Sequence, residues 1–514
     1  MSKKLLMFCA AILALALVVP AYAEVQNVKV SGDLTINALD RYNFALGNTD
    51  VNCGGHQDVL YSVARLRVDA ELTDNVSVVT RLLNERIWGE EYYTDNDGAT
   101  QIPTGSAITS SISLDLAYAV LKEFLYSPLT LTLGRQELHF GNDLIIGDVD
   151  GNSIATPASP LTITQASLTD LGDLSVRKSF DALRGTLNYT VADQPLTVDM
   201  VYSVIDENLN NRDDDVRLYG GNANYPVNND ILTEAYFWTR ERRPDSVASI
   251  TGALTPGQNE LKTERLHVIG TRGVYTGIDN LTLQGEWAYQ FGNKYMDSTL
   301  LPNLITAATI LNNPNGYRLE DSLEDVSAWA LQLGANYAFE DVRHLPVLGI
   351  IYTHLSGENP YDCSGGISEP DGAAWNGWDA MFENQATGTI WNKLLGYSNC
   401  DLINVTGSVK PDFIDDLTIF ANWYHIRLDQ QLSNSEAGLY ILSGVAGGQT
   451  FKVSSDKHVG DEIDVNLVYD YTEDVQLGLN LGWFTPGDLF KSTDGNEVNM
   501  KTATQAIASC KVTF

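Results

Sequence analysis

Positive charge is scarce in this chain of 514 residues, in which 32 lysines and arginines stand against 66 aspartates and glutamates. The formal net charge is therefore −34. Proteins that bind nucleic acid present a basic surface to its phosphates, so this balance argues against a nucleic-acid partner. Acidic runs such as Asp213-Asp214-Asp215 could bind divalent cations, but a solvated acidic surface is the simpler interpretation.

Cysteine and histidine are also scarce, and the usual sequence motifs for metal and redox sites are missing. The cysteines beyond the N-terminal segment are Cys53, Cys363, Cys400 and Cys510, and none forms a C-x-x-C pair. The seven histidines are scattered, without metal-ligand spacing and without a neighbouring nucleophile motif. We therefore predict no cofactor, no metal site and no catalytic residues. Cys363 and Cys400 could form one loop disulfide.

Long apolar runs are missing after the first 23 residues. Lys3 and Lys4 precede the apolar run Leu5–Val19, and Ala21-Tyr22-Ala23 follows it, which predicts a secretory signal peptide over residues 1–23 with an A-x-A cleavage site. Its removal leaves a mature chain from Glu24 with a net charge of about −36. No cysteine follows the cut, so lipoprotein processing is not indicated. No later run approaches the roughly 20 apolar residues of a spanning helix, so only strands could place this chain in a membrane.

Strict alternation of apolar and polar residues is present instead, and it is clearest in Val459–Gly487. A period of two on both sides of the turn Thr472-Glu473-Asp474 indicates a β-hairpin. The apolar face carries Ile463, Val465, Leu467, Tyr469, Val475, Leu477, Leu479, Leu481 and Trp483. Aromatic residues stand at both ends of this face, as they do at the two interfaces of a lipid-facing band.

The same alternation predicts eighteen strands along the chain. They are Val28–Tyr42, Val59–Leu72, Val76–Ile87, Ser111–Glu123, Leu129–His139, Phe180–Val191, Leu196–Ile205, Val216–Asn224, Ile231–Arg240, Lys262–Tyr275, Leu281–Gly292, Val326–Phe339, Val347–Ser356, Asp401–Lys410, Leu417–Asp429, Val459–Tyr471, Val475–Phe484 and Lys501–Phe514. The eighth and ninth segments alternate least clearly. The number is even, as expected for a bacterial outer-membrane barrel.

The connections between these segments alternate between short and long. Short ones include Thr73–Asn75, Leu125–Pro128, Ala192–Pro195, Gly277–Asn280 and Thr472–Asp474, and long ones include Gly141–Ser179, Asn293–Asp325, Gly357–Cys400 and Gln430–His458. A soluble sheet has no reason to keep this rhythm. We therefore predict an all-β fold over residues 24–514, a single transmembrane antiparallel β-barrel of about 18 strands with short periplasmic turns and long extracellular loops.

The last segment ends on an aromatic residue, with Ala506, Ala508, Cys510, Val512 and Phe514 on one face. A terminal phenylalanine on an amphipathic last strand resembles the signal that barrel-assembly machinery recognises. We therefore expect that machinery to be a partner.

Several motifs together resemble the alginate export porin family of outer-membrane barrels. They are Leu133-Gly134-Arg135-Gln136-Glu137, Ser179-Phe180-Asp181-Ala182-Leu183-Arg184, Glu286-Trp287-Ala288-Tyr289-Gln290-Phe291-Gly292, Val459-Gly460-Asp461-Glu462-Ile463-Asp464 and Phe484-Thr485-Pro486-Gly487. They keep the order of the family and span most of the mature chain. The resemblance implies an eighteen-stranded barrel in the outer membrane of a Gram-negative-type cell.

In a barrel the polar half of the alternation lines the lumen, so candidate transport residues are read from it. The basic candidates are Arg41, Arg65, Arg67, Arg81, Arg135 and Arg184, and the acidic candidates on the opposite wall are Glu286, Glu462 and Asp464. Parity from Leu129 points Arg135 into lipid unless a bulge near Gly134 shifts the register, and the family motif favours the lumen.

An arginine arc on neighbouring strands would attract carboxylate or phosphate solutes. The acidic wall would then act as a counter-charge that keeps an anion moving. Alternatively, these arginines pair with Asp69, Glu71, Glu85 and Asp115 as a structural network. The two interpretations are not exclusive.

The sequence thus predicts a non-enzymatic outer-membrane porin for anionic solutes or for an anionic polysaccharide such as alginate or a related uronate polymer. Its expected partners are outer-membrane lipid and lipopolysaccharide, the anionic solute and periplasmic export components. A structural or adhesive barrel with a plugged lumen is the alternative. An outer-membrane hydrolase is a third hypothesis, because barrel enzymes build triads from residues distant in sequence.

Overall fold

The structure is a computed structural model, and it describes residues 26–44, 46, 56–88, 112–149, 174–207, 215–242, 263–295, 323–358, 374–385, 387–394, 397–431, 439–440, 451–452, 454, 456–490 and 500–514. The predicted signal peptide lies outside these residues, as do Cys53 and Cys363. Among the described residues, no helix is long and apolar enough to cross a membrane.

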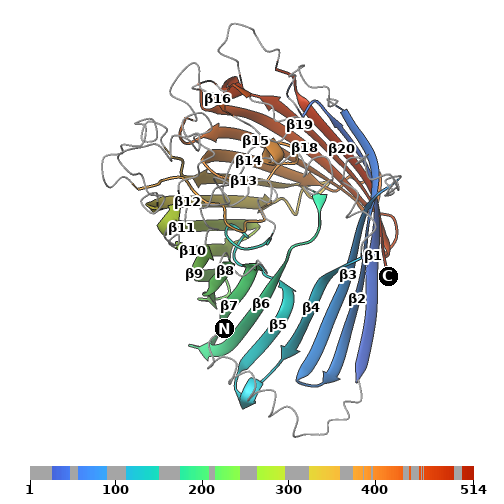
Figure 1. The fold of residues 1–514 in the computed structure, drawn as a ribbon. Coiled ribbons are helices and arrows are strands. Elements are labelled where there is room, and N and C mark those ends of the chain that lie inside the picture. The colour runs from blue at the N-terminus through green and yellow to red at the C-terminus, as the bar shows by residue number, and fades with distance from the viewer. Residues whose placement is uncertain are drawn as a thin grey trace, which may run out of the picture.

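Eighteen of the described strands form one antiparallel sheet that closes on itself (Figure 1). The strands are β1 (Asn27–Tyr42), β2 (His56–Thr73), β3 (Val76–Ile87), β4 (Ser113–Leu121), β5 (Leu129–Glu137), β6 (Ser179–Val191), β7 (Gln194–Asp206), β8 (Val216–Pro226), β9 (Ile231–Arg242), β10 (Glu264–Ile278), β11 (Leu281–Tyr295), β12 (Leu323–Ala338), β13 (Val347–Leu355), β14 (Cys400–Val409), β15 (Leu417–Leu428), β18 (His458–Asp470), β19 (Val475–Pro486) and β20 (Ala503–Thr513). Each strand pairs with the next in sequence, and β1 pairs with β20 to close the ring. Between β15 and β18, β16 (Leu439–Tyr440) and β17 (Phe451–Lys452) form a separate two-residue pairing.

The predicted strands are confirmed, including the eighth and ninth segments, which alternate least clearly. Val76–Ile87 is reproduced residue for residue, and the other strand ends lie within three residues of the prediction. Closure has a physical cause, because an open edge would leave unpaired backbone amides and carbonyls in hydrocarbon. The short turns all lie at one end of the barrel and the long connections at the other, and β1 begins and β20 ends at the turn end.

Side chains alternate between the two faces of the barrel wall, except at β-bulges such as the one in the pairing of β15 with β18. On β19, Leu479 and Trp483 point outward and are 37% and 40% exposed. On the paired strand β18, Glu462 and Asp464 point inward and are buried. A lipid-facing band and a polar interior therefore follow from the period-two pattern, as the sequence predicts.

Two long connections fold back into the barrel, and Figure 1 shows the first of them, the cyan chain after β5, within the ring of strands. We call residues 138–149 inserted segment 1, and the described part of residues 374–399 inserted segment 2. A parallel bridge joins them at Ile146 and Phe382. In segment 1, the Asn142 amide donates to Gln284 of β11 at 3.2 Å and to Gln332 of β12 at 3.1 Å, both on the inner wall.

The inserted segments give the barrel an apolar core inside the lumen. Their buried side chains in this core include Leu138, Leu144, Ile145, Ile146, Trp378, Met381, Phe382, Ile390 and Trp391. They pack against inner-wall residues such as Phe180, Trp238 and Ala288. Burial of one large apolar side chain contributes roughly 1.5–3 kcal/mol, so this cluster holds both segments against the wall.

An ion pair joins segment 2 to β9 and β11. The Asp379 carboxylate accepts two hydrogen bonds from the Arg240 guanidinium, at 2.8 and 2.7 Å, and lies 3.3 Å from the Lys294 ammonium. Burial alone would raise the pKa of Asp379, but Arg240 and Lys294 outweigh it and hold that pKa well below its ordinary range. The carboxylate therefore stays charged wherever the segment is docked.

Cys400 and Cys510 are free thiols, and Cys400 is buried. The loop disulfide between Cys363 and Cys400 that the sequence allowed involves Cys363, which lies outside the described residues.

Because one face of β19 is assigned to lipid, we predict that a charged residue destabilises the barrel more on that face than on the inner face. Replacing Leu479 by arginine should destabilise the barrel by about 2–4 kcal/mol, because a cation near the membrane midplane loses its hydration. The matched variant Asn480→Arg places the same side chain toward the interior and should cost much less. Unfolding in urea from lipid vesicles measures both, and equal costs would contradict the assignment of faces.

From the Asp379 ion pair we predict that inserted segment 2 stays docked against the barrel wall in mild acid. A carboxyl with a lowered folded-state pKa contributes stability that is complete above the unfolded value of roughly 3.9 and is lost only as pH falls through the folded value. Acidification from pH 7 to about 5 should therefore leave this ion pair intact. Asp379→Asn should instead weaken docking, because it leaves buried Arg240 with only the more distant carboxylate of Glu264, 3.4 Å away, and removes the charged partner of Lys294.

Single-channel conductance in planar bilayers tests whether Asp379→Asn weakens the docking of segment 2. We expect larger or noisier openings for Asp379→Asn, and wild-type behaviour for Asp341→Asn, which removes an exposed carboxylate at the turn end. Unchanged conductance in Asp379→Asn would mean that the apolar core alone holds segment 2.

Candidate functional site in the lumen

Five of the six predicted arginines lie on the inner face of the barrel. Arg65 of β2 faces Asp33 of β1 in the strand register, and its Nε donates to the Asp33 carboxylate at 2.8 Å. Arg67, two residues along, donates Nε and Nη2 to Asp69 on its own strand. Residues two apart on a strand share a face, so both ion pairs lie side by side on the inner wall.

Arg81 of β3 forms the most enclosed of these ion pairs. Its Nε donates to Asp115 of β4 and its Nη2 to Glu137 at the end of β5, both at 2.5 Å. The Asp115 side chain is fully buried. Removing one partner of a buried ion pair leaves an uncompensated charge, which typically costs 3–5 kcal/mol. Arg81 therefore joins three strands and is mainly structural.

Arg184 and Arg41 contact aromatic residues as well as polar ones. Arg184 of β6 donates to Asp199 of β7 at 2.7 Å, and its guanidinium lies 5.4 Å from the ring centre of Phe140 in segment 1. Arg41 of β1 donates to Gln505 of β20 at 2.6 Å. It lies 5.1 Å from the Phe44 ring, within the range of a cation–π interaction.

Charge in these ion pairs is not equally accessible. The Arg65 side chain is 25% exposed against 15% for Asp33, and that of Arg67 is 36% exposed against 31% for Asp69. The Arg184 side chain is 29% exposed and that of Asp199 only 6%. In these three pairs the cation is therefore the group that the lumen reaches more easily, whereas Glu137 is 37% exposed against 10% for its partner Arg81.

Arg135 does not lie in the lumen, and this corrects the prediction taken from the family motif. Its guanidinium forms a two-bond ion pair with Asp181 of β6, at 2.8 and 2.6 Å. Asp181 shares the outward face with Leu183, which is 54% exposed. Gly134 has a φ of +120°, yet the pairing of β5 with β4 and β6 runs through it without a register shift. The alternation that begins at Leu129 therefore continues through Gly134, and it places Arg135 on the outer face.

The three predicted acidic residues lie on the inner wall beneath the inserted segments. Glu462 accepts hydrogen bonds from the backbone N–H groups of Thr389, Ile390 and Trp391, at 2.5, 3.0 and 2.7 Å, where the short helix α6 (Trp391–Leu394) begins. Asp464 accepts the Thr389 hydroxyl at 2.8 Å. A carboxylate is favoured at such a site because helical N–H groups there lack partners within the helix.

Glu286 of β11 is also enclosed, and its Oε1 accepts the Tyr236 hydroxyl at 2.8 Å. Glu286, Glu462 and Asp464 are all 2% exposed or less. These three carboxylates therefore hold the inserted segments in place. They do not present charge to the described surface of the lumen.

Sequence reasoning missed one buried ion pair that holds segment 2. The Arg240–Lys294–Asp379 ion pair was not singled out, although Arg240 shares the inward parity of Tyr236 and Trp238. Its partner Asp379 lies in a loop, where parity gives no information.

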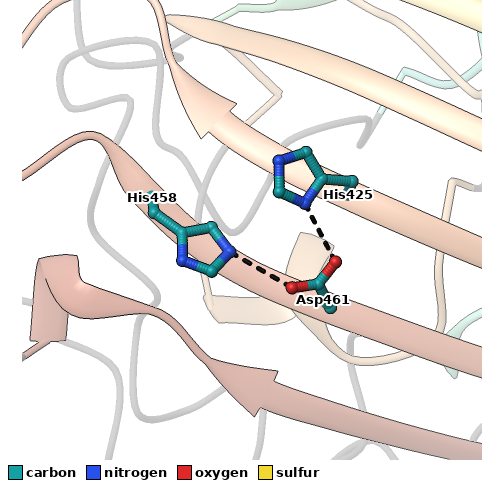
Figure 2. A group of neighbouring side chains, drawn as sticks. All are labelled: His425, His458 and Asp461. Carbon is teal, nitrogen blue, oxygen red and sulfur yellow. Dashed lines mark hydrogen bonds and ion pairs between the residues drawn. The ribbon is translucent and has the colours of Figure 1, made fainter.

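Two sets of potential metal ligands were also missed, because their members come from different strands. One is His425, His458 and Asp461, drawn in Figure 2, and the other is His354, Asp401 and Asp429. Both lie on the outer face of the barrel wall, apart from the lumen.

Two solved structures illustrate what this chain is similar to, and the first of them shows the same fold. OccAB1 of Acinetobacter baumannii aligns with a TM-score of 0.50 and 10% identity, covering 96% of this chain and 99% of that one. A BenF-like porin from Pseudomonas fluorescens Pf-5 aligns with a TM-score of 0.49 and 11% identity, covering 95% and 100%. No curated protein gives a significant match to the sequence.

The family model described as alginate export matches residues 40–504, which is most of the chain. The match agrees with the resemblance seen in the sequence motifs and with the closed barrel of eighteen strands. The chain therefore belongs to the alginate export family of outer-membrane β-barrels.

Proposed function

We propose that this outer-membrane channel passes anionic solutes along its inner wall past Arg65 and Arg67 of β2 and Arg184 of β6. The observation that carries the proposal is the unequal exposure of charge. Arg65, Arg67 and Arg184 are each more accessible than their carboxylate partners. The acidic residues Glu286 of β11 and Glu462 and Asp464 of β18 lie beneath inserted segments 1 and 2 and are buried.

The proposed solute class is a carboxylate-bearing saccharide, with alginate or a related uronate polymer as the first candidate. A guanidinium is always charged and can bind a carboxylate through two parallel hydrogen bonds. The paired aspartates weaken this attraction, so a passing carboxylate would exchange with them and not be trapped. Such weak, repeated binding suits conduction. The family match supports a polysaccharide of this kind.

We further propose that lipid and lipopolysaccharide surround the outer face, that barrel-assembly machinery recognises β20, and that periplasmic export components meet the turn end. No catalytic role is proposed. Arg135 takes no part in selectivity in this account, because its side chain lies on the outer face with Asp181.

A structural barrel with a plugged lumen is the competing function, and the buried apolar core of the inserted segments favours it. Ion flow distinguishes the two. A channel conducts in a planar bilayer with segments 1 and 2 docked, whereas a plugged barrel shows no conductance until they are displaced.

Reversal potentials across a salt gradient test the proposed selectivity. Replacing Arg65, Arg67 and Arg184 together by glutamine should lower or invert the anion-to-cation permeability ratio, because three aspartates then lose their neutralising partners. The effect should shrink as salt rises, since the Debye length falls from about 8 Å at physiological ionic strength to roughly 3 Å at 1 M.

Arg135→Gln is the matched control, since it removes the same charge from the outer face. It should keep the wild-type reversal potential. Anion preference that survives the triple substitution would overturn the assignment of selectivity to these arginines.

A further inference from the structure

Three side chains with metal-binding donors converge on the outer face of the barrel, where β15 ends and β18 begins. Figure 2 shows His425 of β15 and both His458 and Asp461 of β18 pointing toward one another. His425 Nδ1 lies 2.9 Å from Asp461 Oδ1, and His458 Nε2 lies 3.2 Å from Asp461 Oδ2. One donor atom from each residue can be chosen so that all lie within 4.8 Å of one another.

A β-bulge places His458 in this group. Counting from Glu462 and Asp464, which point inward, His458 would also point inward in a regular strand. The register instead passes from Ile426 opposite Gly460 to Arg427 opposite His458, so one residue of β18 has no partner. The extra residue turns His458 to the outer face beside His425, and their rings lie 5.2 Å apart.

Gly460 allows this bulge. Its φ is +152°, and a Cβ added there would lie 2.4 Å from the Thr485 carbonyl oxygen of β19. Any residue with a side chain would therefore push β18 away from β19. The backbone at this point sets the position of His458 and Asp461.

The distances suit one small ion. Zinc binds histidine nitrogen at 2.0–2.1 Å and carboxylate oxygen at 2.0–2.2 Å in tetrahedral geometry, so two of its ligand atoms lie roughly 3.3 Å apart. The separations from the two histidines to the two Asp461 oxygens, 2.9 and 3.2 Å, are close to this value, and the donor atoms of all three residues lie within 4.8 Å of one another. Imidazole ligands favour zinc and its first-row neighbours over magnesium and calcium, which prefer oxygen alone.

The donors of this group are engaged only with one another among the described residues. The second set of potential ligands differs in this respect. There Asp401 Oδ1 already accepts the Tyr352 hydroxyl at 2.6 Å besides contacting His354 Nδ1 at 2.8 Å. Asp429 Oδ2 accepts the Gly357 N–H at 2.8 Å. A metal at the second site would have to break hydrogen bonds that fix the wall.

The surroundings place the first group at the edge of the lipid-facing band. Trp423 of β15 and Ile463 of β18 lie on the same outward faces, two residues closer to the middle of the barrel than His425 and Asp461. Their side chains are 40% and 50% exposed. Trp423 stacks on His425 at 6.0 Å between ring centres. Tryptophan is enriched at membrane interfaces, where water is available to complete the coordination of an ion.

We propose that His425, His458 and Asp461 form a binding site for a divalent transition-metal ion of the zinc class, with a fourth position open to an oxygen ligand. The ion would join β15 to β18 where their long connection leaves the barrel wall. It would thereby stabilise a seam that has no short turn at this end.

Isothermal titration of the full-length mature protein with Zn²⁺ tests the proposal, in detergent, without a polyhistidine tag and after treatment with a chelator. We expect about one ion bound per chain. His425→Gln and His458→Gln should each weaken binding by at least about tenfold, because each removes one ligand. Asp461→Asn should act in the same direction.

Two matched variants control for the other histidines of the outer face. His267→Gln removes a histidine of β10 whose Nδ1 lies 2.8 Å from the Thr239 hydroxyl, and it should leave zinc binding unchanged. His354→Gln should also leave it unchanged. Folding of every variant is checked by heat-modifiable migration in gels, which separates the closed barrel from the unfolded chain.

Cobalt gives a second readout, because Co²⁺ in a tetrahedral site absorbs visible light. The wild type and His354→Gln should show this absorption, and folded His425→Gln should lose it. The proposal is overturned if the wild type shows no saturable binding, if folded His425→Gln and His458→Gln bind zinc as the wild type does, or if His354→Gln is the variant that abolishes binding.

Discussion

The structure depends on one constraint, which is that hydrocarbon offers no partner to a backbone N–H or C=O group. Pairing of β1 with β20 satisfies this constraint by leaving no edge among the eighteen strands of the sheet. Closure fixes the two faces of every strand, because side chains must alternate between lipid and lumen. The outward apolar band, the inward arginines and the position of each ion pair follow from this alternation.

The same constraint acts on the chain that enters the lumen, where backbone groups also need partners. Glu462 meets this need by accepting three consecutive N–H groups at the start of α6, and Asp379 attaches segment 2 to Arg240. Glu462 and Arg240 of the inner wall therefore hold inserted chain. Arg65 and Arg67 of β2 and Arg184 of β6 keep side chains that the lumen can reach. The proposed selectivity rests on this difference in exposure between the charged residues of the wall.

Sequence reasoning predicted the strands well because a period of two is a local signal, repeated in every element. It also predicted that Arg65, Arg67 and Arg81 would point inward, and it named Asp69 and Asp115 as ion-pair partners. It went wrong at Arg135, where a family motif was preferred over parity. It could not find inserted segments 1 and 2, because their contacts join residues far apart in sequence, such as Asn142 and Gln332. The group around His458 was missed because a bulge reverses the parity of that residue.

The central claim is that inserted segments 1 and 2 cover Glu286, Glu462 and Asp464 and leave Arg65 and Arg67 of β2 open to the lumen. Accessibility of single cysteines measures this directly, in a background from which the native cysteines have been removed. Thr35→Cys lies on the inner face of β1, and Gln290→Cys lies on β11 beneath segment 2, where Gln290 bonds Asp379. A small anionic thiol reagent added during single-channel recording should react quickly with Thr35→Cys and reduce the current, while Gln290→Cys stays protected. Equal reaction at the two positions would contradict the account.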